Sequence, residues 1–543
     1  MFLSSRRVSI LFLAFIIGFM HCVIGSGPAG VACARALLAR GARVLMLDAG
    51  IELEPERADL VRQLASVEPS AWPPEEVAVL KGAMNGSAER IPQKLIFGSD
   101  YPYRGADDHV ARRESGARVR PSLALGGFSA VWGAAMLPFR DRDIEGWPVK
   151  SDALAPHYRA VAHITALAAR HDDLEECFPL YSENPGLLRT SSQAERLLRN
   201  LQRHRESLRE SGWRFGRARL ALRAADSPSG RGCVHCRMCL YGCPYGCIYN
   251  SADTVAEMRA DTNFTYQRDV IVRRLRETSE TVVITGYHRL TRQALSFEAG
   301  RVYLAAGIVP TTQILLRSRG AYDRSLVARD SQYFIFPLVS WRRAREARAE
   351  AAYTLSQLFI EIARPQIAPR PVHLQIYGFN DIVAQAVRKS LGPLKLLAPP
   401  LEERVLIAQG YLHSDDSPEI EMTLKRDGEN DYLTVQSKGA AEARRTVGRV
   451  LAEFRRNAWR LGAWPVAPAL QLMQPGAGFH TGGTFPMRAQ PREFESDVLG
   501  RVSGWSRVHA VDASVLPSVP ATTITFPVMA NAHRIGWETA QLK

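Results

Sequence analysis

Five of the eight cysteines in this 543-residue chain lie close together, between residues 233 and 247. The first four are separated by gaps of two, two and three residues and are followed by a proline: Cys233, Cys236, Cys239 and Cys243. Short gaps of this kind let several thiolates converge on one iron–sulfur cluster. The same residues are compatible with a zinc site or with a structural loop of thiols or disulfides, so the spacing leaves three alternatives open.

A second set of residues that points to chemistry is the glycine-rich turn Gly25-Ser26-Gly27-Pro28-Ala29-Gly30. In the spacing Gly-x-Gly-x-x-Gly, the first glycine allows a tight turn, the second lets the backbone approach a pyrophosphate, and the third lets a helix pack against a strand. The start of that helix offers free N–H groups and a partial positive charge to phosphates. The pattern predicts dinucleotide binding, but alone it does not separate FAD from NAD.

The elements that must hold this turn can be inferred from the residues around it. An apolar strand ends at residues 22–24, and residues 31–40 are rich in Ala and Leu, which favours a helix. The apolar residues 44–47 then predict a buried parallel strand. Asp48 stands at the end of this strand, where a carboxylate can accept the hydroxyl groups of a ribose.

The chain carries an excess of positive charge, with 69 Lys and Arg against 55 Asp and Glu and a formal net charge of +14. Such a balance favours acidic substrates, a membrane surface or nucleic acid. We find no nucleic-acid motif and expect no nucleic-acid partner. The densest basic stretch, residues 341–348, predicts a solvated helix face on which Arg342 and Glu346 form an ion pair; the alternative is a site for an anionic partner.

Near the N-terminus, Arg6 and Arg7 precede a nearly continuous apolar run over residues 8–24. This pattern is typical of a signal or a membrane anchor. The run leads directly into Gly25 and leaves no room for a cleavage site, because cleavage would remove the first predicted strand. We therefore expect a cytoplasmic or membrane-associated protein without a cleaved export signal, and residues 8–24 are the candidate for membrane association.

Several further segments resemble the glucose–methanol–choline (GMC) oxidoreductase family and follow the family's order along the chain. Residues 125–133 resemble its flavin segment, although Phe128 departs from the serine that the family usually has there. The other matching segments are residues 305–311, which resemble the strand end beside FAD, residues 478–484, which resemble the catalytic His loop, and residues 497–517, which resemble the C-terminal flavin-binding signature.

The resemblance implies FAD as the cofactor. Together with the glycine turn, it assigns the following residues to FAD: Gly25, Ser26, Gly27, Pro28, Ala29, Gly30, Asp48, Gly126, Gly127, Ser129, Val131, Trp132, Val272, Ala306, Gly307, Asp512, Ala513 and Thr523. Some GMC dehydrogenases carry an iron–sulfur centre near the position of the cysteine cluster. A cluster there would be an electron exit from reduced FAD.

The resemblance also implies the reaction, in which a hydride passes from an alcohol or sugar carbon to flavin N5 and His480 is the general base. A neutral imidazole suits this task because its pKa lies near working pH. The second catalytic position of the family, usually His or Asn, falls on Thr523, or on Thr522 if the register moves by one residue. The expected partner is a small-molecule alcohol or sugar-like substrate, which the sequence does not identify further.

The fold expected from the resemblance is α/β: a Rossmann-like FAD-binding domain split in sequence, with an α+β second domain. An antiparallel sheet in the second domain roofs the flavin, as in p-hydroxybenzoate-hydroxylase-like proteins. The expected division is 1–19, N-terminal extension; 20–140, 225–320 and 490–543, FAD-binding parts, the second including the cysteine-rich segment; 141–224 and 321–489, substrate parts, the second including the His480 loop.

Two other functions are compatible with the same segments. The first is a GMC-fold lyase or other flavoprotein that keeps FAD without net redox chemistry. The second is a non-catalytic FAD-binding protein.

Overall fold

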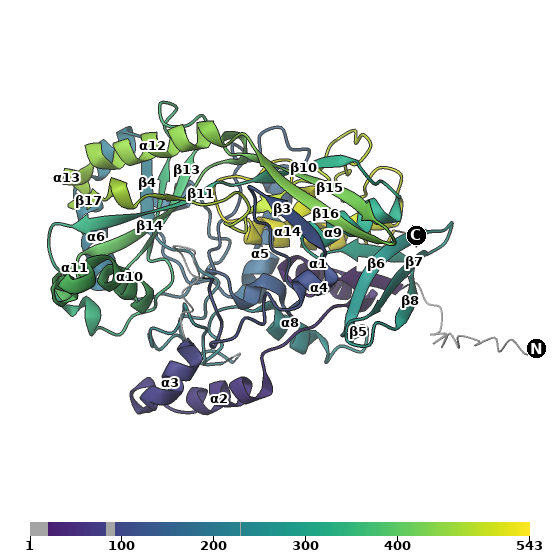
Figure 1. Cartoon of the computed structure of the whole chain (residues 1–543), viewed down its shortest axis with the longest axis horizontal. Helices are drawn as coiled ribbons and strands as arrows, with labels where there is room; N and C mark the ends of the chain where they lie inside the picture. Colours follow the sequence, from purple (N-terminus) through teal and green to yellow (C-terminus); the bar gives the residue numbers. More distant parts are fainter. Residues whose placement is uncertain (1–19, 83–92, 229, 543) are drawn as a thin grey trace, which may run out of the picture.

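The structure, a computed structural model, describes residues 20–82, 93–228 and 230–542. Two lobes lie side by side in Figure 1, one around an antiparallel sheet that contains β11, β13 and β14, the other around α1, α14 and a parallel sheet. The helices are α1 Pro28–Ala39, α2 Pro55–Ala65, α3 Pro74–Lys81, α4 Ala106–His109, α5 Ser151–Thr165, α6 Ser192–Arg203, α7 Arg205–Glu210, α8 Ser251–Met258, α9 Ile308–Ser318, α10 Asp381–Leu391, α11 Ala398–Glu402, α12 Ala440–Arg456, α13 Ala458–Leu461 and α14 Thr525–Thr539.

The parallel sheet is assembled from three distant stretches of chain. Its strands lie in the order β20 (Val508–Ala510), β9 (Arg301–Leu304), β1 (Met20–Ile24), β2 (Arg43–Leu47) and β5 (Phe264–Gln267), and each neighbouring pair is parallel. The central strands are almost fully buried, as expected for a parallel sheet covered on both faces. On one face α1 and α14 pack so closely that a Cβ at Gly536 would lie 2.7 Å from the carbonyl oxygen of Cys33.

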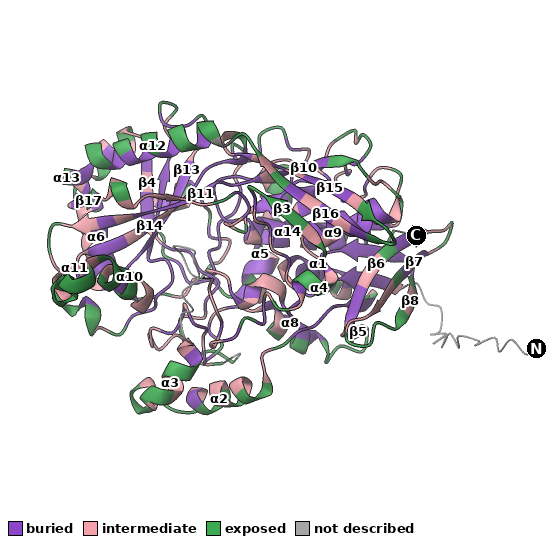
Figure 2. Cartoon of the chain, viewed as in Figure 1, coloured by how far each residue is buried: buried purple, intermediate pink, exposed green. Residues whose placement is uncertain are grey.

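The antiparallel sheet has the strand order β17 (Ala463–Pro465), β11 (Tyr333–Ser340), β14 (Val405–Tyr411), β13 (Val372–Tyr377), β12 (Leu358–Ile362) and β4 (Trp213–Arg217), and β18 (Gln471–Leu472) pairs with β11. Alternate residues of β13 and β14, such as Leu374 and Ala408, enter an apolar core with α6 and α12. Figure 2 shows the resulting division of α12 into a buried and an exposed side. One face of this sheet therefore packs in the apolar core.

The opposite face of the same sheet is polar and aromatic. Because opposed residues of an antiparallel pair point to the same side, the register places His373 and Tyr333 on either side of Tyr411, and Gln375 opposite Gln409. Glu361 of β12 lies opposite His373. We call this set of residues the site face of the sheet.

Two smaller sheets complete the strands of the described residues. One has the order β19 (Thr481–Gly482), β10 (Ser325–Asp330), β15 (Glu419–Asp427), β16 (Asn430–Lys438) and β3 (Arg112–Ser115). The other is an antiparallel meander of β6 (Val270–Glu277), β7 (Val282–His288) and β8 (Ala294–Ala299).

A buried charge network joins the site face to the segment that precedes α5. The guanidinium of Arg140 donates to Asp143 at 2.6 and 2.7 Å and to Glu361 at 2.9 Å. Glu361 also contacts Nδ1 of His373 at 3.3 Å. Burial alone would raise the pKa of Glu361, but the charge of Arg140 and the hydrogen bond with His373 more than offset this effect and leave the pKa below its ordinary value.

Two expectations about charged and apolar surface segments change in the structure. Residues 20–24 of the apolar run 8–24 form β1 inside the parallel sheet, and residues 8–19 lie outside the described residues. No helix within the described residues has the length and apolar character needed to cross a bilayer. The predicted helix face over residues 341–348, with Arg342 paired to Glu346, was wrong. Only Arg345–Arg348 are helical, as a 3-10 turn, and Arg348 forms an ion pair with Glu402.

We predict that Arg140→Met lowers the free energy of unfolding by about 3–5 kcal/mol, because it leaves two buried carboxylates without their partner. The exposed Arg142, whose guanidinium lies 4.0 Å from Glu361, is the matched control, and Arg142→Met should cost less than about 1 kcal/mol. Urea unfolding followed by circular dichroism measures both variants. Equal effects of the two substitutions would contradict the assignment.

Candidate functional site

The predicted glycine turn connects β1 to the first turn of α1. Gly25 has a φ of +104°, and a Cβ there would lie 2.5 Å from the carbonyl oxygen of Ala305. A Cβ at Gly30 would lie 1.9 Å from the carbonyl oxygen of Gly25, so the third glycine permits the close contact of helix and strand. At Gly27, in contrast, a Cβ would meet no atom within 4 Å. The open space therefore lies at the position where the motif predicts a pyrophosphate.

Asp48 lies directly after β2 and is held by hydrogen bonds from two sides. Ser26 Oγ donates to Asp48 Oδ2 at 2.7 Å, and Tyr266 OH donates to the same oxygen at 3.1 Å. Burial raises the pKa of this carboxyl to about 6, although the hydrogen bonds from Ser26 and Tyr266 act in the opposite direction. Val272 lies in β6 and is half-buried. Its strand begins next to Asp48, because Val270 N donates a hydrogen bond to the carbonyl oxygen of Asp48.

Residues 125–133 lie against the glycine turn. Gly126 and Gly127 both have positive φ values, and a Cβ at Gly127 would lie 3.3 Å from Gly27 Cα. Gly126 N donates to Ser26 Oγ at 2.9 Å. Ser129 Oγ lies 2.7 Å from the hydroxyl of Ser251 at the start of α8, a contact that the sequence had not indicated. Val131 is buried, and Trp132 donates to the carbonyl oxygen of Tyr249.

Asp512 joins the C-terminal segment to the start of α9. Its Oδ2 accepts hydrogen bonds from Gly307 N at 2.9 Å and from Thr311 Oγ1 at 2.6 Å. Gly307 has a φ of +86° and, like Gly27, no atom within 4 Å of a built Cβ. Ala306 and Gly307 follow β9, and Asp512 and Ala513 follow β20, so both predicted segments stand at the carboxyl ends of adjacent parallel strands.

His480 lies at the start of β19, with its ring stacked on Tyr411 at a centroid distance of 4.6 Å. Its Nδ1 is buried and has no hydrogen-bond partner among the described residues. Burial, and to a lesser degree the nearby His373, lowers the pKa of the imidazole to about 3. The ring is therefore neutral at physiological pH, and its pKa lies well below the value near working pH that we expected for the base.

Asp330 anchors the His480 loop on both sides of the histidine. Its carboxylate accepts hydrogen bonds from Gly476 N at 2.9 Å and from Thr481 Oγ1 at 2.7 Å. Burial raises the pKa of Asp330 to about 7, against these two bonds. Sequence reasoning missed this residue, because nothing in the sequence around β10 links Asp330 to the distant His480 loop.

The two threonines at the second catalytic position differ in their contacts. Thr523 Oγ1 donates to the carbonyl oxygen of Ala135 at 3.1 Å. Thr522 Oγ1 is buried and has no hydrogen-bond partner among the residues that the structure describes. The hydroxyl without a partner is therefore that of Thr522, the alternative register, while Thr523 links the C-terminal segment to the chain after residue 133.

Contacts between these segments bring the predicted site together. The Phe128 ring, at the position that departs from the GMC pattern, packs edge-on against Phe479, next to His480, at 4.9 Å. Gly483 N donates to the carbonyl oxygen of Ala513 at 2.9 Å. The glycine turn, residues 125–133, the His480 loop and the C-terminal segment thus form one continuous set of contacts.

The cysteine-rich segment adjoins this set, because Trp132 donates to the carbonyl oxygen of Tyr249, directly after it. All five of its cysteines are free thiols. Cys243 Sγ accepts from Cys247 N at 3.3 Å, and Cys239 Sγ accepts from Thr354 N at 3.4 Å. In the described part of the chain, no three His, Cys, Asp or Glu side chains converge in a way that could hold a metal ion. The iron–sulfur hypothesis therefore has no support from the arrangement of these side chains.

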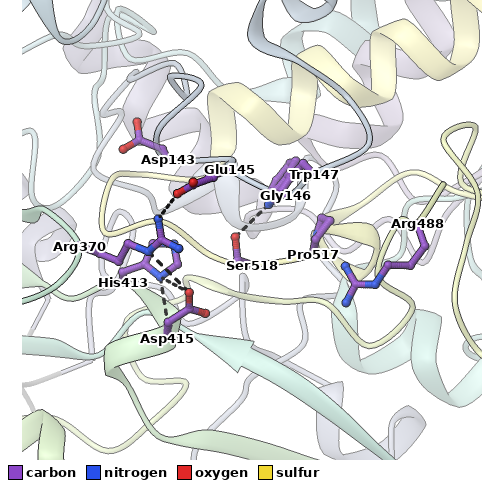
Figure 3. A pocket seen from close by; sticks show the side chains of 10 residues that line it. All are labelled: Asp143, Glu145, Gly146, Trp147, Arg370, His413, Asp415, Arg488, Pro517 and Ser518. Atoms are coloured by element: carbon purple, nitrogen blue, oxygen red, sulfur yellow. Dashed lines mark hydrogen bonds and ion pairs between the residues drawn. The ribbon is translucent and has the colours of Figure 1, made fainter.

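A separate charged cavity of about 170 Å³ lies beyond the end of β14 (Figure 3). Arg370 reaches across it to Glu145 at 3.0 Å and to Asp415 at 3.8 Å. Trp147 Nε1 donates to Ser518 Oγ at 2.9 Å on the opposite wall. The charges in this cavity are largely matched, and the contacts tie the segment before α5 to the C-terminal segment.

The residues of the site fit FAD. The N-terminus of α1 has no side-chain cap and no acidic residue in its first turn, so its N–H groups are available for phosphates. Gly27 and Gly307 leave open space where side chains would stand. Asp48 stands one strand away from the glycine turn, at the carboxyl edge where open α/β sheets bind nucleotides.

Two solved structures are similar to this chain over nearly its whole length. One is a pyridoxine 4-oxidase from Mesorbium loti, with a TM-score of 0.58, 15% sequence identity and coverage of 96% of this chain and 99% of the oxidase. The other is a mutant formate oxidase from Aspergillus oryzae RIB40, described for the effect of its mutation on FAD modification. Its TM-score is 0.60 and its sequence identity 15%, with coverage of 96% of this chain and 98% of the formate oxidase. No protein-family model matches the sequence, and no curated protein matches it. The likeness confirms the predicted fold class, a Rossmann-like FAD-binding domain with a substrate domain.

We predict that Gly27→Ala and Gly30→Ala fail in different ways. The Cβ at position 27 meets no protein atom, so the apoprotein should unfold at an unchanged temperature while FAD binds at least about tenfold more weakly. The Cβ at position 30 collides with the Gly25 carbonyl, so that variant should lose thermal stability even without FAD. Flavin titration and thermal unfolding of both apoproteins measure the difference. Normal FAD affinity in Gly27→Ala would be incompatible with a pyrophosphate at this turn.

Proposed function

We propose that this protein is an FAD-dependent oxidoreductase of the GMC type that oxidises CH–OH groups. The observation that carries the proposal is the set of contacts that joins the glycine turn to the His480 loop through Gly127 and Phe128. A nucleotide-binding edge and a neutral, unpartnered imidazole are thereby brought into one site. The oxidases named above, which share the fold, are consistent with this class of activity.

In the proposed reaction, His480 takes the hydroxyl proton of the substrate. The imidazole is neutral because burial lowers its pKa to about 3, so it need not lose a proton before it can act as the acceptor. Stacking on Tyr411 and the two hydrogen bonds of Asp330 fix the ring and its loop, which limits the loss of entropy on reaction. FAD, when bound, supplies the hydride acceptor.

The site face of the antiparallel sheet supports a neutral, hydroxyl-bearing substrate such as an alcohol or a sugar. Gln375, Gln409, Tyr333 and Tyr411 offer uncharged hydrogen-bonding groups on this face. The one carboxylate of the set, Glu361, is already matched by Arg140 and His373. A cationic substrate would find no free counter-charge among these residues.

The electron acceptor is left open in this proposal. An iron–sulfur exit at Cys233, Cys236, Cys239 and Cys243 stays a prediction from their spacing, and no step of the reaction depends on it. Iron and acid-labile sulfide, measured after anaerobic purification, separate a cluster from zinc and from plain thiols. Their joint presence in stoichiometric amounts would support the cluster.

We predict that His480→Gln slows the anaerobic bleaching of the flavin by a suitable alcohol about 10²–10⁴-fold while the FAD content stays unchanged, because only the proton acceptor is lost. His533→Gln is the matched control, since His533 contacts His157 outside the site, and it should bleach at the normal rate. Stopped-flow absorbance records both variants. Bound flavin that no alcohol or sugar bleaches would favour a lyase or a non-catalytic flavoprotein.

We also predict that His480 adds no titration to the pH dependence of kcat/KM between pH 8 and pH 5, so that a fall in this range comes from Asp330, with a pKa of about 7, or from Asp48, with a pKa of about 6. A general base is active when it is deprotonated, and the lowered pKa of His480 keeps it deprotonated down to about pH 3. An ordinary histidine with a pKa near 6.5 would lose activity over the same range. A steep fall between pH 7 and pH 6 that persists in both Asp330→Asn and Asp48→Asn would contradict the buried, neutral state of His480.

A further inference from the structure

Residues 388–397, at the end of α10 and in the 3-10 turn after it, form the most unusual apolar surface among the described residues. We call them the leucine segment. Three large apolar side chains within four positions are mostly exposed: Leu394 (61%), Leu396 (87%) and Leu397 (60%). Elsewhere in the described ranges, exposed large apolar side chains stand singly in the sequence. A cluster of this kind marks an interaction surface, whereas single exposed leucines are ordinary.

The charges around the leucine segment have one sign. No acidic residue occurs between Asp381 and Glu402. Lys389 and Lys395 are exposed and form no ion pair within the part of the chain that the structure describes, while Arg388 bonds to Glu402 at 2.7 Å. The surface therefore combines protruding leucines with two lysines that have no counter-charge.

The basic stretch 341–348 is connected to the base of this segment. Arg343 pairs with Glu403 at 2.7 Å, and Arg348 pairs with Glu402 at 3.2 Å. Trp341, at the start of the stretch, is half-exposed. The densest basic run of the sequence is thus tied by ion pairs to the residues that follow the leucine segment, at the end of the antiparallel lobe where α10 lies (Figure 2).

We propose that the leucine segment docks the protein on the surface of an anionic lipid bilayer. Leucines would enter the boundary between headgroups and acyl chains, and the lysine side chains would extend to the anionic headgroups. Anionic lipids attract basic residues near the surface, and the net charge of +14 acts in the same direction. The mode is peripheral: a short segment lies in the interface and does not span it.

The leucine segment follows the site face closely along the chain. β13 carries His373, Gln375 and Tyr377 on the site face, and only three residues separate its end from the first residue of α10. The Tyr377 hydroxyl lies 3.5 Å from a Cβ built at Gly133, in the segment that resembles the flavin-binding one. The chain therefore passes from the site face through the eleven residues of α10 to the proposed docking surface.

The test compares the full chain with the triple variant L394S/L396S/L397S. On vesicles of phosphatidylglycerol and phosphatidylcholine, we expect the triple variant to bind about tenfold more weakly or worse, and vesicles of phosphatidylcholine alone to bind the unaltered chain weakly. The matched control is L187S/L290S, which removes two leucines exposed at 72% and 66% in other places and should bind normally. Thermal unfolding verifies that both variants fold.

A second readout reports on the segment itself and does not depend on any other membrane contact of the chain. Trypsin cleaves after Lys389 and Lys395, and anionic vesicles should slow cleavage there but not after Arg292 in the β7–β8 turn. Unchanged cleavage at the two lysines would overturn the proposal. So would a protein that is oligomeric without vesicles and becomes monomeric in the triple variant, because the leucines would then cover one another in a second copy.

Discussion

The site depends on close contacts between main-chain atoms at positions where only glycine fits. At the carboxyl edge of the parallel sheet, Gly25 touches the carbonyl of Ala305, Gly30 touches the carbonyl of Gly25, and Gly127 approaches Gly27. Any side chain at Gly25 or Gly30 would have to displace main-chain atoms. The strands β20, β9, β1 and β2 end at the same edge, so Asp512, Gly307, the glycine turn and Asp48 are brought together by the topology of the sheet.

The His480 loop adds a neutral imidazole to the carboxyl edge of the parallel sheet. Protein atoms enclose the His480 imidazole well enough to keep it neutral, and its loop is fixed by a buried carboxylate that receives two hydrogen bonds. A charged histidine would be costly in this environment because burial disfavours the ionised form. The enclosure that keeps the imidazole deprotonated at ordinary pH also makes it a weaker base than a free histidine.

Local patterns in the sequence predicted the parts of the site that local rules govern. The glycine turn, the helix after it and Asp48 follow from spacing and apolar runs, and the resemblance placed Gly307, His480 and Asp512 on segments that the structure brings into contact. What could not be predicted depends on long-range register. Tyr411 reaches His480 only because β13, β14 and β11 pair as they do, and the hydroxyl of Thr523 is engaged by Ala135, far away in the sequence. The helix face that was to pair Arg342 with Glu346 was wrong because residues 341–344 are not helical, and the neighbouring Arg343 and Arg348 pair with Glu403 and Glu402.

Alternate residues along each strand of the antiparallel sheet have different roles: one set packs in the apolar core, and the other set lies on the site face. In β13, residues 372, 374 and 376 fill the core with α6 and α12, while residues 373, 375 and 377 line the site. Exchanges at residues 375 and 377 would therefore change the surface of the site without replacing any side chain of the apolar core. A change at His373 would differ, because His373 also belongs to the buried charge network through Glu361.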